Sequence, residues 1–176
     1  VALPGIAAPK AKKKKKFTVP TRDPRHRNNF GGVLMTENNG GEEGQMVAMD
    51  EFKFSRVGFI KVDIEGMEAD FLKGAAKTIA KYRPLLYMEA DGSQKTEAVR
   101  ILMEWGYECW WSLVPIYNPD NFAGDAENII VAENGQIIGS VNMLCVPGER
   151  KAKVEGSKRI EDPEDTPWEI KEEELV

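Results

Sequence analysis

After an irregular first quarter, apolar residues fall into a regular pattern along this chain. Three short apolar segments, at 57–63, 85–90 and 107–113, have the length and composition of buried strands. Two longer segments, at 67–82 and 94–106, repeat their apolar residues every three or four positions. That spacing places apolar side chains on one face of a helix, so the pattern predicts two amphipathic helices between the strands.

Both predicted helices carry signals for their ends. The apolar face of the first comprises Met67, Phe71, Leu72, Ala75, Ala76 and Ile79. Glu68 and Lys73 are expected to flank that face. Basic residues near the carboxyl end suit the helix dipole, and Pro84 prevents the helix from continuing. Gly106 is expected to close the second helix.

The alternation of strands and helices predicts an α/β fold. Helices of this length between strands imply right-handed crossovers and a parallel sheet. Residues 128–147 predict one or two further strands around an Asn-Gly turn at Asn134–Gly135. Because that turn is short, at least one strand near the end of the chain is expected to be antiparallel.

The ends of the chain depart from this pattern. Lys12 to Lys16 are adjacent like charges, which favour a solvated, mobile loop that trypsin would cut first; a nucleic-acid contact is the alternative. Residues 37–44 are expected to form a polar loop. Residues 149–176 are highly charged and show no core face, so they predict an extended tail, with Trp168 as a docking residue.

Composition narrows the class of protein. The 176 residues suffice for one domain with a core, and 41% apolar with 30% charged residues is typical of a globular chain. A net charge of −5 argues against general nucleic-acid binding. No apolar run approaches the ~18 residues that suggest a membrane-spanning helix, so no membrane partner is expected.

Rare residues add further expectations. Cys109 and Cys145 lie in apolar segments without metal-type neighbours, which predicts buried free thiols in a reducing, cytoplasmic compartment. His26 is the only histidine, so a histidine-rich metal site is excluded. Trp110 and Trp111 are adjacent on a predicted strand and therefore point to opposite faces, with at least one in the core.

Carboxylates follow two of the predicted strands. Asp63 and Glu65 come directly after the first, and Glu89 ends the second. Ligands of open parallel sheets bind at the carboxyl ends of the strands, where carboxylates can bind a hydroxyl or amine, hold a metal or act as a general base. Gly66 permits a sharp turn or a close ligand approach. The alternative is a plain strand-to-helix turn that uses Asp, Glu and Gly for capping.

These residues carry a resemblance to a known family. "FIKVDIEGMEADFLKGAAKTI" followed by "RPLLYMEA" resembles the central signature of the FkbM-type S-adenosylmethionine-dependent methyltransferases. Upstream, "MVAMDEF" resembles the Leu-Asp-x-Leu segment of that family, with Met49 in place of a leucine, and "NNFGG" resembles its Asn/Gly loop. "YNPDNFAGDAENI" and "VNMLCVP" resemble its closing segments.

The resemblance implies a Rossmann-like class I methyltransferase sheet that uses S-adenosylmethionine. The segments beginning at 60, 84, 107 and 141 would be its fourth to seventh strands. Asp63 and Glu65 would be catalytic, and the acceptor would be a small molecule or sugar hydroxyl. The implied cofactor residues are Ala2, Asp63 and Gly66. The implied substrate residues are Asn29, Gly31, Gly32, Glu89, Asn118 and Asn121.

One departure from the family's pattern affects these expectations. The glycine-rich loop after a first strand and the acidic residue ending a second strand are not found in the sequence. The resemblance implies that residues 1–5 would be the end of a third strand. Residues 1–148 are therefore expected to be a partial domain, inactive alone, with a fourth strand left at an edge. A partner chain or an amino-terminal half would complete the sheet. The alternative function is a non-catalytic methyltransferase-fold scaffold in a larger assembly.

Overall fold

The computed structural model describes residues 6–7, 16–20, 23, 25, 41–90, 93–122, 124, 126–127 and 139–167. The strands of its main sheet are β4 (Phe59–Val62), β5 (Leu85–Glu89), β6 (Tyr107–Pro115), β7 (Gly139–Pro147) and β8 (Arg159–Ile160). The helices α1 (Glu68–Tyr82) and α2 (Lys95–Glu104) follow β4 and β5. Both helices and the three strands expected between 57 and 113 are therefore confirmed, with small shifts of their ends. The expected burial of the first strand was wrong, since only Val62 of the four β4 residues is buried, as the strand lies at an edge of the described sheet.

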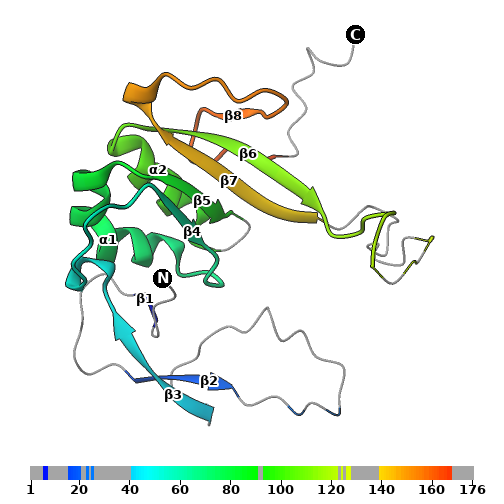
Figure 1. Ribbon diagram of the computed structural model, residues 1–176, viewed down its shortest axis with the longest axis horizontal. Coiled ribbons are helices and arrows are strands. Elements are labelled where there is room, and N and C mark those ends of the chain that lie inside the picture. Colours follow the sequence, from blue (N-terminus) through cyan, green and yellow to red (C-terminus); the bar gives the residue numbers. More distant parts are fainter. Residues whose placement is uncertain are drawn as a thin grey trace.

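The strands lie side by side in the order β4-β5-β7-β6-β8 (Figure 1). β4 and β5 are parallel, whereas β7 runs antiparallel to both β5 and β6. This confirms the predicted antiparallel strand near the end of the chain. Within the described residues β4 has a neighbour on one side only, so it lies at an edge of the sheet, as expected. The Asn134–Gly135 turn lies outside the described residues.

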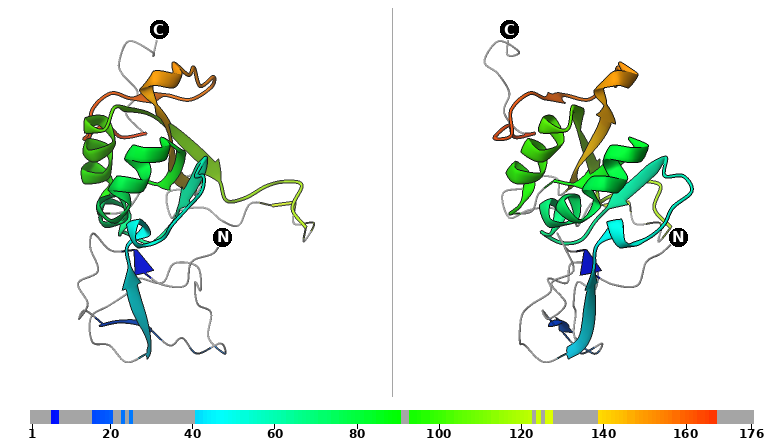
Figure 2. Two further views of the ribbon diagram at one scale, coloured as in Figure 1. Left: turned by 60° about the vertical axis from the view of Figure 1, so that its left-hand side comes forward. Right: turned by 90° about the vertical axis from the view of Figure 1, so that its left-hand side faces the viewer.

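The core lies between the sheet and the two helices, which cover the same face (Figure 2). Alternate strand residues point toward the helices because side chains of a strand alternate between its faces. The buried cluster includes Val62, Leu86, Met88, Met143 and Cys145 from the sheet and Leu72, Ile79, Val99 and Leu102 from the helices. Full burial of one such side chain stabilises the fold by roughly 1.5–3 kcal/mol.

The helix ends follow the sequence signals. α1 ends at Arg83, which has a left-handed φ of 47°, and Pro84 follows. Gly106 adopts a φ of 71° after α2, and its N–H donates to the Met103 carbonyl at 2.9 Å. The expectation for Glu68 was wrong: its side chain is 1% exposed instead of flanking the buried face. Burial is tolerated because Glu68 Oε1 accepts a hydrogen bond from the Gly66 N–H.

A second, smaller sheet lies below the main body and consists of β1 (Ile6–Ala7), β3 (Gly41–Val47) and β2 (Lys16–Pro20), in that order (Figure 1). Two expectations are corrected here. The supposed polar loop contributes its last residues to β3, and Lys16 begins β2. These strands form by hydrogen bonding between backbones. A search for alternating apolar residues therefore does not detect them. Lys12–Lys15 lie outside the described residues, as do Val1–Gly5, where the end of a third strand was expected.

The carboxyl-terminal segment also differs from its prediction. β8 pairs with β6, and the Ile160 side chain is 2% exposed within the core. The Lys95 ammonium donates to the carbonyls of Pro163 and Asp165, at 3.0 and 2.8 Å. The expectation that residues 149–176 have no side chain in the core was therefore wrong. Burial of Ile160 alone is enough to hold the charged strand β8 against β6. Trp168 lies outside the described residues, and the boundary at 148/149 stays a prediction.

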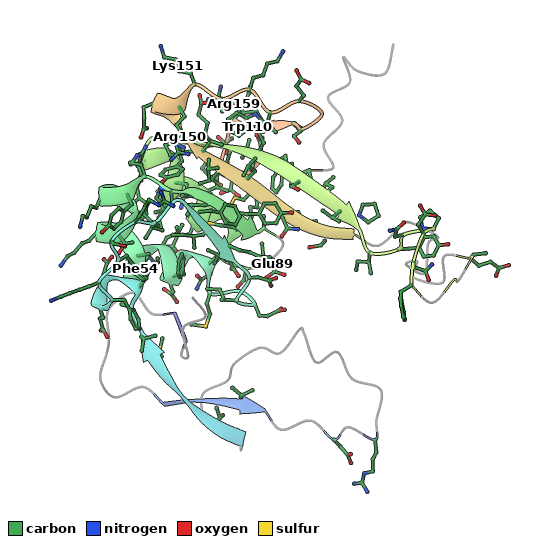
Figure 3. The ribbon with its side chains drawn as sticks, viewed as in Figure 1. Phe54, Glu89, Trp110, Arg150, Lys151 and Arg159 are labelled. Carbon is green, nitrogen blue, oxygen red and sulfur yellow. The ribbon has the colours of Figure 1, made fainter. Side chains whose placement is uncertain are left out.

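The tryptophans and cysteines lie as their positions on the strands predict. Trp111 packs in the core, whereas Trp110 faces the other side beneath the Arg159 guanidinium, 6.0 Å from the ring centroid (Figure 3). Cys109 and Cys145 are buried free thiols, directly opposite each other on β6 and β7. Their compartment stays a prediction. None of the helices in the described part of the chain combines the length and apolar character that a membrane crossing requires.

Candidate active site

The carboxyl ends of β4 and β5 bring three carboxylates together. The parallel register pairs Val62 with Met88, so Asp63 and Glu89 occupy neighbouring positions at the same edge. Glu65 follows in the turn to α1. Carboxylate oxygens of Asp63, Glu65 and Glu89 all lie within 4.8 Å of one another. The expected acidic rim is thus formed, and Figure 3 shows Glu89 at the end of its strand.

The turn from β4 into α1 has an unusual backbone. Glu65 has a φ of 52° and Gly66 a φ of 85°. A left-handed glutamate is strained, and such strain concentrates at functional sites. Glycine is required at position 66 because of its positive φ. A side chain would have room there, since an added Cβ would meet only the Ser93 Oγ at 3.8 Å. The turn therefore holds the Glu65 carboxylate at the rim.

The capping alternative finds little support in this turn. The N-cap residue of α1 is Met67, whose side chain makes no capping hydrogen bond. Instead, Glu68 Oε1 accepts the Gly66 N–H at 3.0 Å. Asp63 and Glu65 both precede the N-cap position, so capping does not explain why two carboxylates stand there.

The start of α1 is fastened to the start of α2. The Asp70 N–H donates to Gln94 Oε1 at 3.1 Å, and Gln94 Nε2 donates to Asp70 Oδ2 at 3.2 Å. This pair of bonds fixes the two turns that follow β4 and β5 relative to each other. Sequence reasoning missed Gln94, since a glutamine at the start of a helix carries no distinctive signal.

Charge at the rim is partly compensated. The Lys61 ammonium forms an ion pair with Asp63, and both side chains are about half exposed. Glu68 Oε2 is buried and has no hydrogen-bond partner among the described residues. The edge gathers three carboxylates, which can attract a cationic or hydrogen-bond-donating ligand. Their spacing also suits hard cations, which prefer oxygen ligands.

Two further expected site residues, Asn118 and Asn121, lie apart from this cluster. Asn118 Oδ1 accepts the Asp120 N–H, and Asn121 Nδ2 donates to the Asn118 carbonyl. Both residues lie on the segment after β6 that projects from the sheet (Figures 1 and 2). Ala2, Asn29, Gly31 and Gly32 lie outside the described residues, so their expected roles stay predictions.

Asp50 has a role that the sequence did not reveal. It lies in η1 (Met49–Glu51), and its Oδ2 accepts the Lys77 N–H at 3.0 Å. Its Oδ1 accepts the Thr78 N–H at 2.8 Å and the Thr78 hydroxyl at 2.7 Å. The carboxylate thus anchors the segment before β4 to α1. An acidic residue directly after the apolar residues Met46, Val47 and Met49 was the available signal.

Comparison with known proteins gives one match. The family model described as methyltransferase FkbM domain matches residues 15–109, more than half of the chain. The matched part contains the acidic rim, both helices and the Asp50 anchor. No curated protein and no solved structure matches the chain.

Proposed function

Because this chain belongs to the FkbM methyltransferase domain family, we propose that it is part of an S-adenosylmethionine-dependent methyltransferase that acts on a hydroxyl of a small molecule or sugar. The observation that carries this proposal is the cluster of Asp63, Glu65 and Glu89 oxygens at the ends of two parallel strands. This position is where open α/β sheets bind ligands. The fold we propose is the Rossmann-like class I sheet.

The rim residues fit the chemistry of this cofactor. S-adenosylmethionine supplies a methyl group on a cationic sulfonium. Negative charge from Asp63 and Glu65 complements a cation, and carboxylate oxygens accept hydrogen bonds from hydroxyl and ammonium groups. Gly66 adds no side chain beside them. We assign Asp63 and Gly66 to the cofactor.

The chain's own residues supply two further actions in this mechanism. Asp63 or Glu65 accepts the proton of the acceptor hydroxyl as it becomes a nucleophile. Lys61 holds the Asp63 carboxylate through their ion pair. Glu89 on the neighbouring strand orients the acceptor by a hydrogen bond. Holding the acceptor in a reactive position contributes to the rate because less orientational freedom has to be lost at the transition state.

The exposed edge of the sheet suggests how the site is completed. β4 has no strand on its outer side within the described residues, and Phe59 is 57% exposed there. Unpaired backbone groups on an apolar strand favour the addition of another strand. That strand would come from a partner chain or from another part of the same protein. Without it, the 176 residues should bind S-adenosylmethionine weakly, with a Kd beyond roughly 1 mM.

The test measures methyl transfer and binding separately. In the complete enzyme, with the added strand present, Asp63→Asn and Glu65→Gln should each remove most transfer of labelled methyl groups while the melting temperature stays within error of the parent. Asp63 is half exposed and its only described ion pair is exposed, so its contribution to stability is about 0–1 kcal/mol. Glu104→Gln, an exposed carboxylate at the end of α2, is the matched control.

Two results would count against the proposal. Full transfer in the Asp63→Asn and Glu65→Gln variants would remove both residues from the mechanism. No transfer by the complete protein with the added strand present, together with no binding of S-adenosylmethionine, would favour the scaffold alternative. Tight, stoichiometric binding to the 176 residues in titration calorimetry would overturn the need for an added strand.

A further inference from the structure

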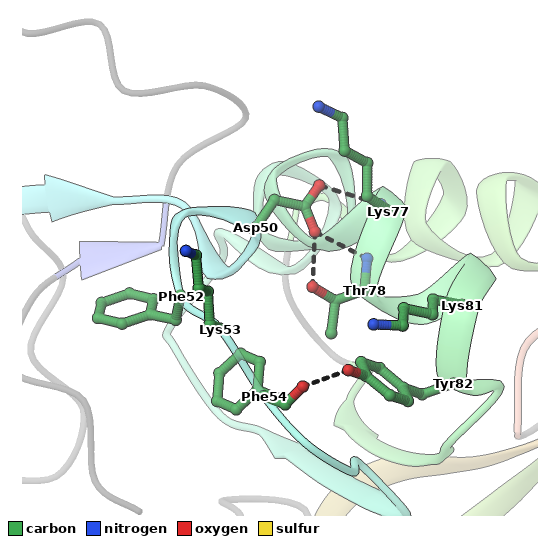
Figure 4. Close-up of a pocket in the computed structure, with 8 residues that line it drawn as sticks. All are labelled: Asp50, Phe52, Lys53, Phe54, Lys77, Thr78, Lys81 and Tyr82. Carbon is green, nitrogen blue, oxygen red and sulfur yellow. Dashed lines mark hydrogen bonds between the residues drawn. The ribbon is translucent and has the colours of Figure 1, made fainter.

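A pocket of about 360 Å³ lies at the other end of α1 from the acidic rim. It forms between the segment 50–54 and the last turns of the helix, as Figure 4 shows. Residues 68 and 81 are separated along the helix by roughly 20 Å at 1.5 Å per residue. The pocket is therefore a different place from the candidate active site. Its volume falls in the range of small-ligand sites.

The charges around this pocket are unbalanced. Lys53, Lys77 and Lys81 line it, all three are exposed, and none forms an ion pair with a described residue. The one carboxylate in the lining is Asp50, whose oxygens are already engaged by two backbone N–H groups and a hydroxyl of α1. An anion entering the pocket would consequently meet unpaired ammonium groups, with the carboxylate's hydrogen-bonding capacity largely used.

Aromatic side chains supply the walls. Phe52 and Phe54 are half-buried, with ring centroids 6.3 Å apart and planes inclined at 43°. The Tyr82 ring lies opposite, and the Lys81 ammonium is 4.6 Å from its centroid (Figure 4). Such rings bind a planar apolar group by stacking or edge contact. The pocket thus offers aromatic surface next to positive charge.

The lining is held in place before any ligand arrives. The Tyr82 hydroxyl donates to the Phe54 carbonyl, and Asp50 is bound to Lys77 and Thr78 of the helix. These contacts fasten both ends of the segment 50–54 to α1. A pre-formed site loses less conformational freedom on binding, which favours affinity.

We propose that this pocket binds a small phosphorylated ligand with an aromatic ring, in the size class of a mononucleotide. The phosphate lies against Lys53 and Lys81, because ammonium groups bind phosphate as point charges. The ring lies against Phe52, Phe54 and Tyr82. A carboxylate would satisfy the charge less fully, since it carries a single negative charge. The inference is independent of methyl transfer at the acidic rim.

Titration of the 176-residue chain with phenyl phosphate tests the proposal, with phenol and inorganic phosphate as partial probes. Phenyl phosphate should bind saturably with a Kd near or below about 1 mM. Each partial probe should bind about tenfold more weakly, since it lacks one of the two contacts. Raising the salt concentration should weaken phenyl phosphate binding, because exposed charges are screened.

Matched variants locate the site. Lys53→Gln combined with Lys81→Gln should weaken phenyl phosphate binding about tenfold, and Phe54→Leu should weaken phenyl phosphate but leave inorganic phosphate unchanged. Lys153→Gln removes an exposed lysine elsewhere and should leave the Kd unchanged. Melting temperatures equal to the parent's would show that the variants fold.

The proposal is overturned by any of three results. These are no saturable binding of phenyl phosphate, equal affinity for inorganic phosphate, or an equal loss of affinity in the Lys153→Gln control. The first would mean that the lysines are only solvated basic residues that offset the dipole at the carboxyl end of α1. The second would remove the aromatic part of the ligand, and the third would place binding elsewhere.

Discussion

Thr78 is held twice by the Asp50 carboxylate, through its backbone N–H at 2.8 Å and its hydroxyl at 2.7 Å, both to Oδ1. The contact joins residues 28 positions apart and crosses from the segment before β4 to the middle of α1. Thr78 is 6% exposed, so the hydroxyl would otherwise lack a partner in the core. This pair is therefore a tertiary anchor for the helix that begins at the acidic rim.

Removing the Asp50 carboxylate should destabilise the protein. Asp50→Ala leaves the Thr78 hydroxyl and two backbone N–H groups without their acceptor. We expect the free energy of unfolding to fall by about 2–3 kcal/mol, the range for hydrogen bonds to a charged group. Thr78→Val removes the hydroxyl bond alone and should cost about 1 kcal/mol. Urea denaturation of both variants measures their free energies of unfolding. The prediction would be contradicted if Asp50→Ala lowered this free energy by no more than Thr78→Val does.

Glu149 should make the protein sensitive to acid. Arg83 bonds to both oxygens of Glu149 at 2.8 Å, and this hydrogen bonding lowers the pKa of the Glu149 carboxyl from 4.5 to about 2. A pKa depressed in the folded state contributes stability above pH 4.5, and this contribution is lost as the pH falls toward 2. Since Glu149 is solvent-exposed, the effect on melting temperature should be small but directional.

The pH series can be checked with a neutral isostere. Glu149→Gln should show a shallower fall in melting temperature between pH 5 and pH 2, roughly the window of the shift. Glu155→Gln, an exposed carboxylate without an ion pair among the described residues, should follow the parent. If melting temperature fell equally with pH in the parent and in Glu149→Gln, the Arg83–Glu149 ion pair would not contribute to stability in solution.

Docking of the carboxyl-terminal segment should depend on Ile160. Its side chain is 2% exposed in the core, so Ile160→Ala leaves a cavity and should lower the free energy of unfolding by about 2–4 kcal/mol. Arg159→Ala removes an ion pair to Glu108 that is partly exposed and should cost about 1 kcal/mol or less. Thermal unfolding of the two variants gives the comparison. Equal stability of the Ile160→Ala variant and the parent would mean that this segment does not dock.

The two cysteines should be inert until the protein unfolds. Both are fully buried, and burial, followed by the hydrogen bond between the two thiols, raises the pKa of the Cys145 thiol well above its usual value. The thiolate is the reactive form, so a thiol reagent should modify neither residue in native buffer and both in guanidinium chloride. Rapid modification of the native protein would contradict this burial.

Much of the main sheet could be predicted from the sequence, because its elements have strong local signals. The period of apolar residues fixed the type of both helices, and Pro84 and Gly106 marked their ends. The same alternation predicted that Trp110 and Trp111 face opposite sides of one strand. For the site, the positions of Asp63, Glu65 and Glu89 at strand ends followed directly from the pattern.

Contacts between distant segments could not be predicted in this way. β2 and β3 pair through their backbones, which leaves little trace in the order of apolar and polar residues. Docking of β8 depends on Ile160 finding space beside β6, and the charged residues around it suggested a solvated tail. The segment that carries Asn118 and Asn121 projects from the sheet, which chain position could not reveal, and their substrate role stays a prediction.

By itself, the sequence determined the two helices, the three strands between 57 and 113 and which carboxylates follow those strands. Local periodicity and turn chemistry suffice for that, since they act between residues a few positions apart. Only the tertiary structure decided that β4 lies beside β5, that β7 lies between β5 and β6, and that Asp50 holds α1. The register of β4 on β5 then brought the three carboxylates together. Which strands and helices become neighbours depends on how all of them together bury one shared core. That depends on the whole chain and cannot be read from a short segment.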